Sequence, residues 1–302
     1  MKNDVLQKWQ GPFVAIVTPF DQEGRIVPGD FNILVESFIE DGARGIIVAG
    51  HNGECWALKV EELKSLVSLA VKKAKGRVPV LCGVEAVRAA DVVDVAESVA
   101  EAGAQGIMVE PPYVVTTATD SELINRFEHI ADKSPVPVML YNNPRRTQIS
   151  LNAEVLSKLA KHENIAAIKE STRDLGELSV KIELAGKDVN VFVGPSTLIF
   201  PGLLLGAKGF ISSGPMELLR KDGYRLYELA VAGKVKEAIK LHFKVTRIYR
   251  ALMGIGTWPA ALKASLNALG RPAGIPRKPV QPLSGEDHKR LIQILQGVGV
   301  LP

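Results

Sequence analysis

The chain has 302 residues, of which 46% are hydrophobic and 23% are charged, and its formal net charge is +4. This length and apolar content allow a large core and fall within the size range of one α/β barrel. No run of five or more like charges and no basic helix stripe occurs, which argues against nucleic-acid binding.

Short apolar runs rich in β-branched residues recur along the first two-thirds of the chain and predict buried strands. The eight runs are residues 13–17, 45–49, 78–82, 106–110, 136–141, 165–169, 189–193 and 208–212. Between them lie segments with helical periodicity, for example 60–75, 89–102, 121–132 and 152–161. Eight βα units over about 200 residues predict a (β/α)8 TIM barrel. A doubly wound open sheet is disfavoured because no Gly-x-Gly-x-x-Gly opens a helix after the first strand.

From about residue 214 onward the pattern is helical only. Residues 221–232, 235–253, 259–269 and 285–296 read as helices, with breaks rich in Gly or Pro such as 270–276. We therefore expect a barrel catalytic domain over residues 1–232 and a C-terminal helical region over 233–302.

The amino-terminal residues contain no apolar signal region, and no apolar stretch reaches the roughly 18 residues of a transmembrane helix. The two cysteines, Cys55 and Cys82, fit reduced thiols better than a disulfide framework. These features predict a soluble, cytoplasmic domain of enzyme size that neither binds nor spans a membrane.

Lys169 is the most informative residue, because it ends a short apolar run that predicts a buried strand. A lysine there is either a strand-end residue that extends to water or an amine held in a dry site with a lowered pKa. An uncharged amine is the nucleophile that attacks a ketone to form a Schiff base. The first interpretation is favoured for the residue alone, and the polar residues expected around it favour the second.

Active sites of such barrels lie at the carboxyl ends of the strands, where side chains from several strands converge. The expected strand ends carry several polar or glycine-rich segments: 50–54, 110–113, 141–147, 169–172, 194–196 and 212–215. Gly50 and Gly53 are either plain turn residues or part of a loop whose backbone N–H groups bind a carboxylate. Tyr141 is either a core residue or a phenol that transfers protons next to Lys169. Arg146 is either a surface residue or a fork for a second carboxylate.

A metal site at His51, Glu54 and Cys55 is disfavoured, because their spacing matches no closed zinc pattern. We expect Glu54 to hold its loop through hydrogen bonds, and Cys82 to act as a small apolar residue. No metal is predicted.

Three motifs closely resemble the dihydrodipicolinate synthase/N-acetylneuraminate lyase family, and the likeness covers essentially the whole chain. They are Gly50-x-x-Gly53-Glu54, Tyr141-Asn142-x-Pro144-x-Arg146-Thr147 and Ile168-Lys169-Glu170. The resemblance implies a (β/α)8 barrel with C-terminal helices, assembled as a homotetramer or homodimer. It also implies class I aldolase chemistry, in which a lysine forms a Schiff base with pyruvate or another 2-oxo acid without metal or organic cofactor.

Carried over by motif position, Lys169 is the Schiff-base lysine and Tyr141 is the proton-transferring phenol. The loop 50–53 would bind the carboxylate of the 2-oxo acid, with Asn52 donating from its side chain and backbone. Gly194 and Ile211 match positions that line the pocket, and Tyr113 matches a tyrosine that reaches the site of a neighbouring subunit.

Two positions bear on the identity of the second substrate: one matches the synthases of the family and the other departs from them. Arg146 matches the arginine that the synthases use for the carboxylate of aspartate semialdehyde. His51 and Asn52, however, stand where the synthases have two threonines, the first of which relays a proton, and a histidine can relay one too. The leading expectation is a synthase-like condensation of pyruvate with aspartate semialdehyde. The alternative within the class is an aldolase or dehydratase acting on 4-hydroxy-2-oxoglutarate or a 2-keto-3-deoxy sugar acid.

Alternatives outside this class are a phosphate-binding barrel isomerase and a barrel that binds without turnover. The glycine-bearing loops after the seventh and eighth strands would suit the isomerase. It has no evident use for a lysine beside a tyrosine, and a binding barrel has no need of both.

Overall fold

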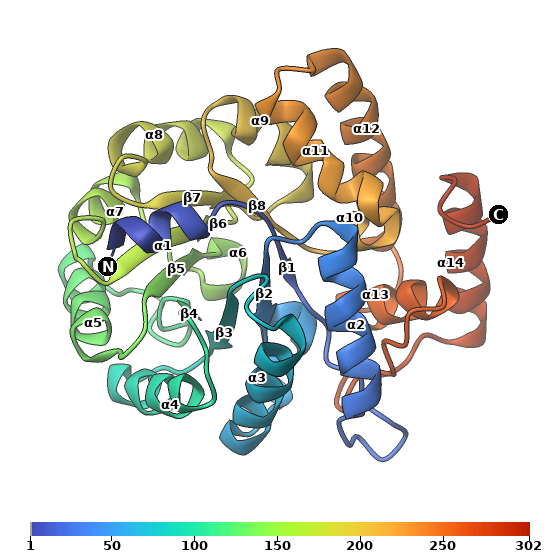
Figure 1. Ribbon diagram of the computed structural model, residues 1–302, viewed down its shortest axis with the longest axis horizontal. Coiled ribbons are helices and arrows are strands. Elements are labelled where there is room, and N and C mark those ends of the chain that lie inside the picture. The colour runs from blue at the N-terminus through green and yellow to red at the C-terminus, as the bar shows by residue number, and fades with distance from the viewer. Residues whose placement is uncertain (1) are drawn as a thin grey trace.

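Eight parallel strands close into a barrel and follow the order of the sequence in the computed structural model, which describes residues 2–302 (Figure 1). The strands are β1 (Gly11–Ala15), β2 (Gly45–Val48), β3 (Val80–Val84), β4 (Ile107–Val109), β5 (Val138–Asn142), β6 (Ile165–Glu170), β7 (Asn190–Val193) and β8 (Gly209–Ser212). The predicted TIM barrel is confirmed, and each predicted run contains or overlaps one strand. The largest displacements are at β1 and β3, which lie two residues from the predicted positions. β3 begins directly after Pro79, whose nitrogen carries no hydrogen to donate to a neighbouring strand.

Helices surround the barrel. In chain order they are α1 (Lys2–Lys8), α2 (Pro28–Asp41), α3 (Val60–Ala74), α4 (Ala89–Glu101), α5 (Asp120–Lys133), α6 (Pro144–Thr147), α7 (Ala153–Leu159), α8 (Leu175–Ala185), α9 (Ile199–Leu204), α10 (Pro215–Leu219) and α11 (Lys221–Val231), followed by α12 (Val235–Leu252), α13 (Trp258–Ala268) and α14 (Gly285–Gly297). Short 3-10 turns occur at η1 (His51–Gly53), η2 (Cys55–Ala57) and η3 (Ser196–Leu198). None of the helices in residues 2–302 has the length and apolar character needed to cross a membrane.

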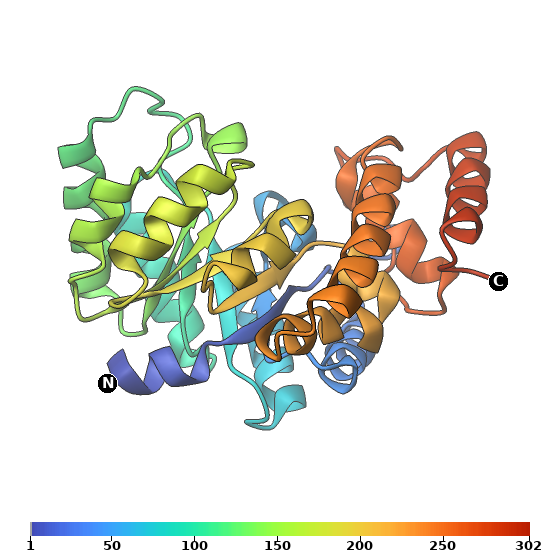
Figure 2. The same cartoon turned by 90° about the horizontal axis from the view of Figure 1, so that it is seen from above.

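Sequence reasoning missed α1, which packs near the amino-terminal end of the barrel (Figure 2). The Lys2 amine donates hydrogen bonds to the carbonyls of Ala160 and His162 at 2.6 and 2.9 Å. The Asn190 amide reaches the carbonyls of Leu6 and Trp9, both at 2.7 Å. Because these contacts are long-range, the local pattern of residues 2–8 could not have indicated this position.

The C-terminal helices α12, α13 and α14 lie together on one side of the barrel (Figure 2). They contribute Tyr249, Met253 and Trp258 to the cavity described below. The division of the chain at residue 232 stays a prediction.

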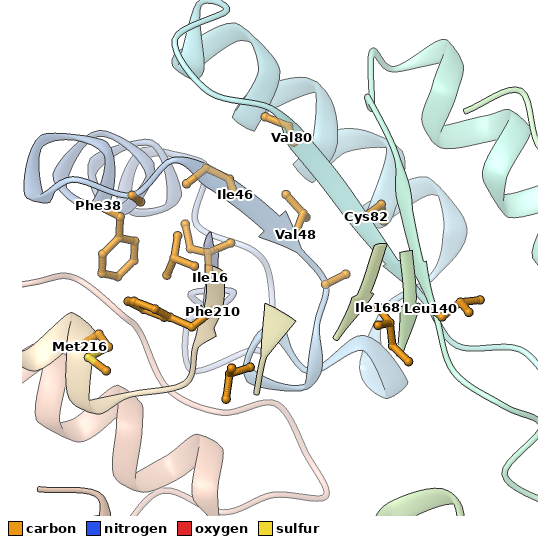
Figure 3. Close-up of a cluster of buried hydrophobic side chains, with 14 of the residues drawn as sticks. Ile16, Phe38, Ile46, Val48, Val80, Cys82, Leu140, Ile168, Phe210 and Met216 are labelled. Atoms are coloured by element: carbon orange, nitrogen blue, oxygen red, sulfur yellow. The ribbon is translucent and has the colours of Figure 1, made fainter. Parts of the chain in front are cut away.

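Two apolar clusters build the core, because successive side chains of a strand point to opposite faces. The larger cluster lies between the strands and the helices and includes Ile46, Cys82, Leu140 and Ile168 (Figure 3). The smaller cluster fills the barrel and includes Phe13, Leu81, Met139, Tyr141, Phe192 and Ile211. Cys82 is therefore the small apolar residue that was expected. Tyr141 and Lys169, one residue past the outward-facing Leu140 and Ile168, point to the barrel interior.

Candidate active site

Lys169 lies on β6 directly beside Tyr141 on β5, where the two residues pair in register. Only 5% of the lysine is exposed. Burial lowers the pKa of the Lys169 amine to about 8, against an opposing effect of the nearby Glu110 carboxylate. A group with this pKa is about 10% neutral at pH 7, whereas an ordinary lysine is only about 0.03% neutral. The site therefore holds a nucleophilic amine.

The phenol of Tyr141 is positioned by two polar neighbours. The lysine nitrogen lies 4.0 Å from the centre of the Tyr141 ring. The Asn143 amide donates to the phenolic oxygen at 3.1 Å, and His51 Nδ1 lies 3.4 Å from it. Burial is the main cause that raises the pKa of Tyr141. A phenolate is therefore costly here, so this group acts best by passing protons rather than by holding a charge.

The loop after β2 has a strained backbone. Ala49 and Glu54 flank it in the left-handed region, with φ of 53° and 58°, a conformation that costs non-glycine residues roughly 1–3 kcal/mol. Glu54 is fully buried, where it is paired with the Lys263 amine and accepts the Arg277 backbone N–H at 2.8 Å. Glu54 thus holds its loop, as expected from the sequence.

Gly53 and Asn52 of this loop are closely fitted, whereas a Cβ on Gly50 would meet no atom closer than 3.5 Å. A Cβ on Gly53 would lie 2.9 Å from the Ile16 carbonyl oxygen, and the Gly53 N–H already bonds to the Gly50 carbonyl at 2.9 Å. The Asn52 side chain donates to the Ala15 carbonyl at 3.1 Å and accepts from the Trp258 indole at 2.9 Å. Asn52 is consequently a fixed element of the cavity wall, with one amide hydrogen engaged.

Arg146 extends from α6 over the indole of Trp56, with 4.9 Å between its guanidinium carbon and the ring centre. It also contacts Glu85 at 3.4 Å, and the other oxygen of Glu85 accepts from the Cys55 thiol at 2.9 Å. About a third of the Arg146 side chain, 36%, is exposed. The guanidinium is therefore held in place yet open to a ligand.

His51, Cys55 and Glu85 place metal-ligand-type atoms within 4.8 Å of one another. Burial, followed by the Glu85 charge, raises the pKa of the Cys55 thiol well above its ordinary value. A protonated thiol is a poor metal ligand, and Glu85 already has Arg146 as its counter-charge. Each group also has a protein partner, since Cys55 donates to Glu85, Glu85 pairs with Arg146, and His51 contacts Glu110, so the three fit a metal ion poorly.

A cavity of about 410 Å³ opens above Lys169 at the carboxyl end of the barrel. Of the predicted site residues, six line it: Lys169, Tyr141, His51, Asn52, Arg146 and Gly194. Gly50 lines a smaller adjoining cavity, Gly53 is buried in the loop, and Ile211 is buried in the barrel interior. Tyr113 is 40% exposed on the chain surface and does not line the cavity. Within this single chain, Tyr113 thus does not lie with the predicted site residues that line the cavity.

The family model described as "Dihydrodipicolinate synthetase family" matches residues 8–298. The chain belongs to this family. It is 32% identical over 293 residues to the 4-hydroxy-tetrahydrodipicolinate synthase of Geotalea uraniireducens, covering 97% of this chain and 100% of the relative.

Solved structures give the same result. The chain matches dihydrodipicolinate synthase from Aquifex aeolicus with a TM-score of 0.90 and 30% identity, covering 97% of this chain and 99% of the other. It matches the Acinetobacter baumannii dihydrodipicolinate synthase complexed with pyruvate with a TM-score of 0.91 and 27% identity, with the same coverage.

Membership of the dihydrodipicolinate synthetase family confirms the sequence-based resemblance and its class of chemistry. The protein is a lyase of the class I aldolase type, which forms a Schiff base. The phosphate-binding isomerase and the binding barrel are thereby set aside.

Several cavity residues were not given an individual role from the sequence. They are Asn143, Arg145, Ser171, Arg173, Pro195, Ser213, Tyr249, Met253 and Trp258. Asn143 and Ser171 follow the ends of β5 and β6 and lie within the strand-end segments 141–147 and 169–172 that the sequence indicated. Tyr249, Met253 and Trp258 come from the C-terminal helices, whose packing over the barrel has no local sequence signal.

Proposed function

We propose that the protein condenses pyruvate, held as a Schiff base on Lys169, with aspartate semialdehyde, the reaction named in its 4-hydroxy-tetrahydrodipicolinate synthase relatives. The observation that carries this proposal is the buried, pKa-lowered amine of Lys169 beside the Tyr141 phenol in an arginine-lined cavity.

The first half of the reaction is imine formation. The neutral Lys169 amine adds to the pyruvate carbonyl, forming a C–N bond while the carbonyl π electrons move to oxygen. Tyr141 supplies a proton to that oxygen and takes one from the nitrogen that has just bonded to carbon. It passes this second proton to the same oxygen, and the C–O bond then breaks to release water and leave the protonated imine; the proton lost when the lysine ammonium became neutral restores the phenol. The imine withdraws electrons, so loss of a methyl proton gives the enamine carbon that attacks an aldehyde.

A second anionic group on the aldehyde partner is supported by three arginines at the cavity. Arg145, Arg146 and Arg173 all line it. Arg173 also bonds to the Tyr249 hydroxyl at 2.5 Å. Guanidinium groups bind carboxylates through paired, charge-assisted hydrogen bonds. Aspartate semialdehyde carries such a carboxylate.

A second candidate is an aldolase or dehydratase acting on 4-hydroxy-2-oxoglutarate or a 2-keto-3-deoxy sugar acid. The observation that favours it is His51, a large ring in the cavity wall where the synthases have a threonine. Both candidates use the same imine on Lys169 and differ only in the partner.

The assembly is also proposed rather than observed. We propose a cytoplasmic homotetramer or homodimer in which Tyr113 lies at a subunit boundary, since Tyr113, Val114 and Val115 are exposed side by side on the loop after β4.

A panel assay tests the proposed reaction. Pyruvate is offered with aspartate semialdehyde and with neutral aldehydes, and 2-keto-3-deoxy sugar acids and 4-hydroxy-2-oxoglutarate are offered alone. Preferred turnover of aspartate semialdehyde supports the first candidate. Preferred cleavage or dehydration of a single acid would replace it with the second.

A further inference from the structure

Glu110 is a buried carboxylate at the carboxyl end of β4, to which the reaction above gives no role. Its side chain is 7% exposed, and Oε2 lies 3.0 Å from His51 Nε2. Within residues 2–302, the other oxygen, Oε1, is buried without a hydrogen-bond partner. A buried acceptor without a partner costs folding free energy, so its presence calls for an explanation.

Hydrogen-bond directions around the phenol define a chain of donors. The Asn143 amide donates to the Tyr141 oxygen, so the phenolic hydrogen is free to point to His51 Nδ1. A carboxylate accepts, so the hydrogen of His51 lies on Nε2 and is donated to Glu110. Nδ1 then carries a lone pair that faces the Tyr141 hydroxyl.

The backbone of β3 allows His51, on the loop after β2, to reach Glu110 at the end of β4. A Cβ on Gly83 would lie 2.4 Å from the Ala49 carbonyl oxygen, and glycine therefore lets the loop after β2 approach closely. Gly83, His51, Glu110 and Tyr141 surround the same small cavity. The loop is fixed in turn by the buried Glu54–Lys263 pair.

We propose that Glu110 and His51 form an intramolecular proton relay for Tyr141, with Glu110 as a positioning residue that fixes the tautomer of His51 and stabilises its charged form. The relay lies within one chain and does not depend on a residue from another subunit. This inference deepens the proposed function and rests on imine formation at Lys169.

The proton balance shows why a relay is needed. Starting from the ammonium form, Lys169 gives up two hydrogens from nitrogen as the C–N bond forms and becomes the protonated imine. The carbonyl oxygen gains both and leaves as water. His51 holds one of these protons as imidazolium between the two transfers, because the Tyr141 phenol passes protons but is too costly to leave ionised.

Charged groups around the relay also affect its response to pH. The charged ones are Glu85, Arg146, Lys169 and Glu217, from the end of β3, α6, β6 and α10, and the Cys55 thiol of η2 is a titratable but uncharged neighbour. Glu110 and Glu217 each raise the pKa of Lys169. Removal of either carboxylate charge therefore lowers the pKa of Lys169 and moves the pH dependence of imine formation to lower pH. Only the rate at pH values above the Lys169 pKa, where the amine is neutral in every variant, reports on the relay.

The test measures the single-turnover rate of imine formation with pyruvate, quenched with borohydride, across pH in wild type, Glu110→Gln and Glu217→Gln. Glu217 is the matched control, since it is a buried carboxylate that accepts the Gly214 N–H and makes no contact with His51 or Tyr141 among the hydrogen bonds of the described chain. A glutamine at 110 either accepts from His51 without a charge or donates to it and reverses its tautomer. We expect Glu110→Gln to lower the high-pH plateau about 100-fold, and Glu217→Gln to leave it within about twofold of wild type.

His51→Gln is the second variant, because His51 is partly exposed and tolerates substitution more readily than a buried carboxylate. It should lower the plateau as much as Glu110→Gln, and the double variant should lose no more, since Glu110 acts through His51. An unchanged plateau in Glu110→Gln or His51→Gln, or equal losses in Glu110→Gln and Glu217→Gln, would overturn the relay. Absence of imine at Lys169 in wild type would instead overturn the proposed function.

Discussion

The Lys169 amine lies over the face of the Tyr141 ring, 4.0 Å from its centre, on two strands that pair in register. The aromatic face, with burial, makes a dry environment in which the amine loses its proton more readily. The same pairing brings the phenol close to the place where the carbonyl oxygen must be protonated. One strand-to-strand contact thus places the proposed nucleophile beside its proposed acid.

The pH dependence of imine formation follows from the lowered pKa of Lys169. The ammonium form is inactive and predominates below the pKa, so the trapping rate with subsaturating pyruvate should rise with pH and reach half of its maximum near pH 8. Rates measured by borohydride quenching from pH 6 to 10.5 test this. A midpoint near the ordinary lysine value of 10.5 would contradict it.

Arg146→Ala should weaken the second substrate selectively. Loss of a group paired with a buried charge costs about 2–5 kcal/mol, which is roughly 30-fold to several thousand-fold in binding. Pyruvate trapping at Lys169 should persist, since the proposed carboxylate contacts of pyruvate lie on loop 50–53. The measurement is KM for each substrate together with borohydride trapping.

Arg145→Ala is the matched control for this change, as Arg145 also lines the cavity but does not stack on Trp56. Arg145→Ala should weaken binding of the second substrate less than Arg146→Ala does. Equal loss of pyruvate and of the second substrate in Arg146→Ala would show that Arg146 maintains the site instead of binding the partner. No loss of either would favour a substrate that does not use this arginine.

Tyr113→Phe should lower the rate without unfolding the protein, because only a hydroxyl is removed from an exposed ring. The loss should be well below that of Glu110→Gln if the relay within one chain is the main path for protons. Steady-state rates and thermal unfolding of both variants provide the comparison. A larger loss in Tyr113→Phe would make the neighbouring subunit the main proton donor.

Much of this architecture could be predicted because it depends on local patterns. Buried runs predicted the eight strands, and the rule that barrel active sites lie at strand ends brought Lys169, Tyr141 and His51 together in advance. The role of Glu110 could not be predicted, since His51 reaches it across β3, and that reach depends on the missing side chain of Gly83. Trp258 was missed because α13 meets the barrel only through long-range packing.

Lys263→Met should destabilise the fold and the loop that carries His51. Glu54 is fully buried, and removal of its partner leaves an unpaired charge, at a cost of about 3–5 kcal/mol in the free energy of unfolding. Lys64→Met, which breaks the exposed pair with Glu101, should cost no more than about 1 kcal/mol. Urea denaturation measures both. A similar loss of unfolding free energy in Lys263→Met and Lys64→Met would contradict the claim that the buried Glu54–Lys263 pair stabilises the loop.

The central claim is the imine at Lys169, and mass spectrometry after borohydride reduction with pyruvate tests it most directly. One peptide, the one containing Lys169, should gain the mass of a reduced pyruvyl group, and the enzyme should lose activity in parallel. Lys169→Arg should show neither the label nor turnover, because arginine stays protonated and cannot act as the nucleophile. Label on another lysine, or no label on the wild-type protein, would contradict the account.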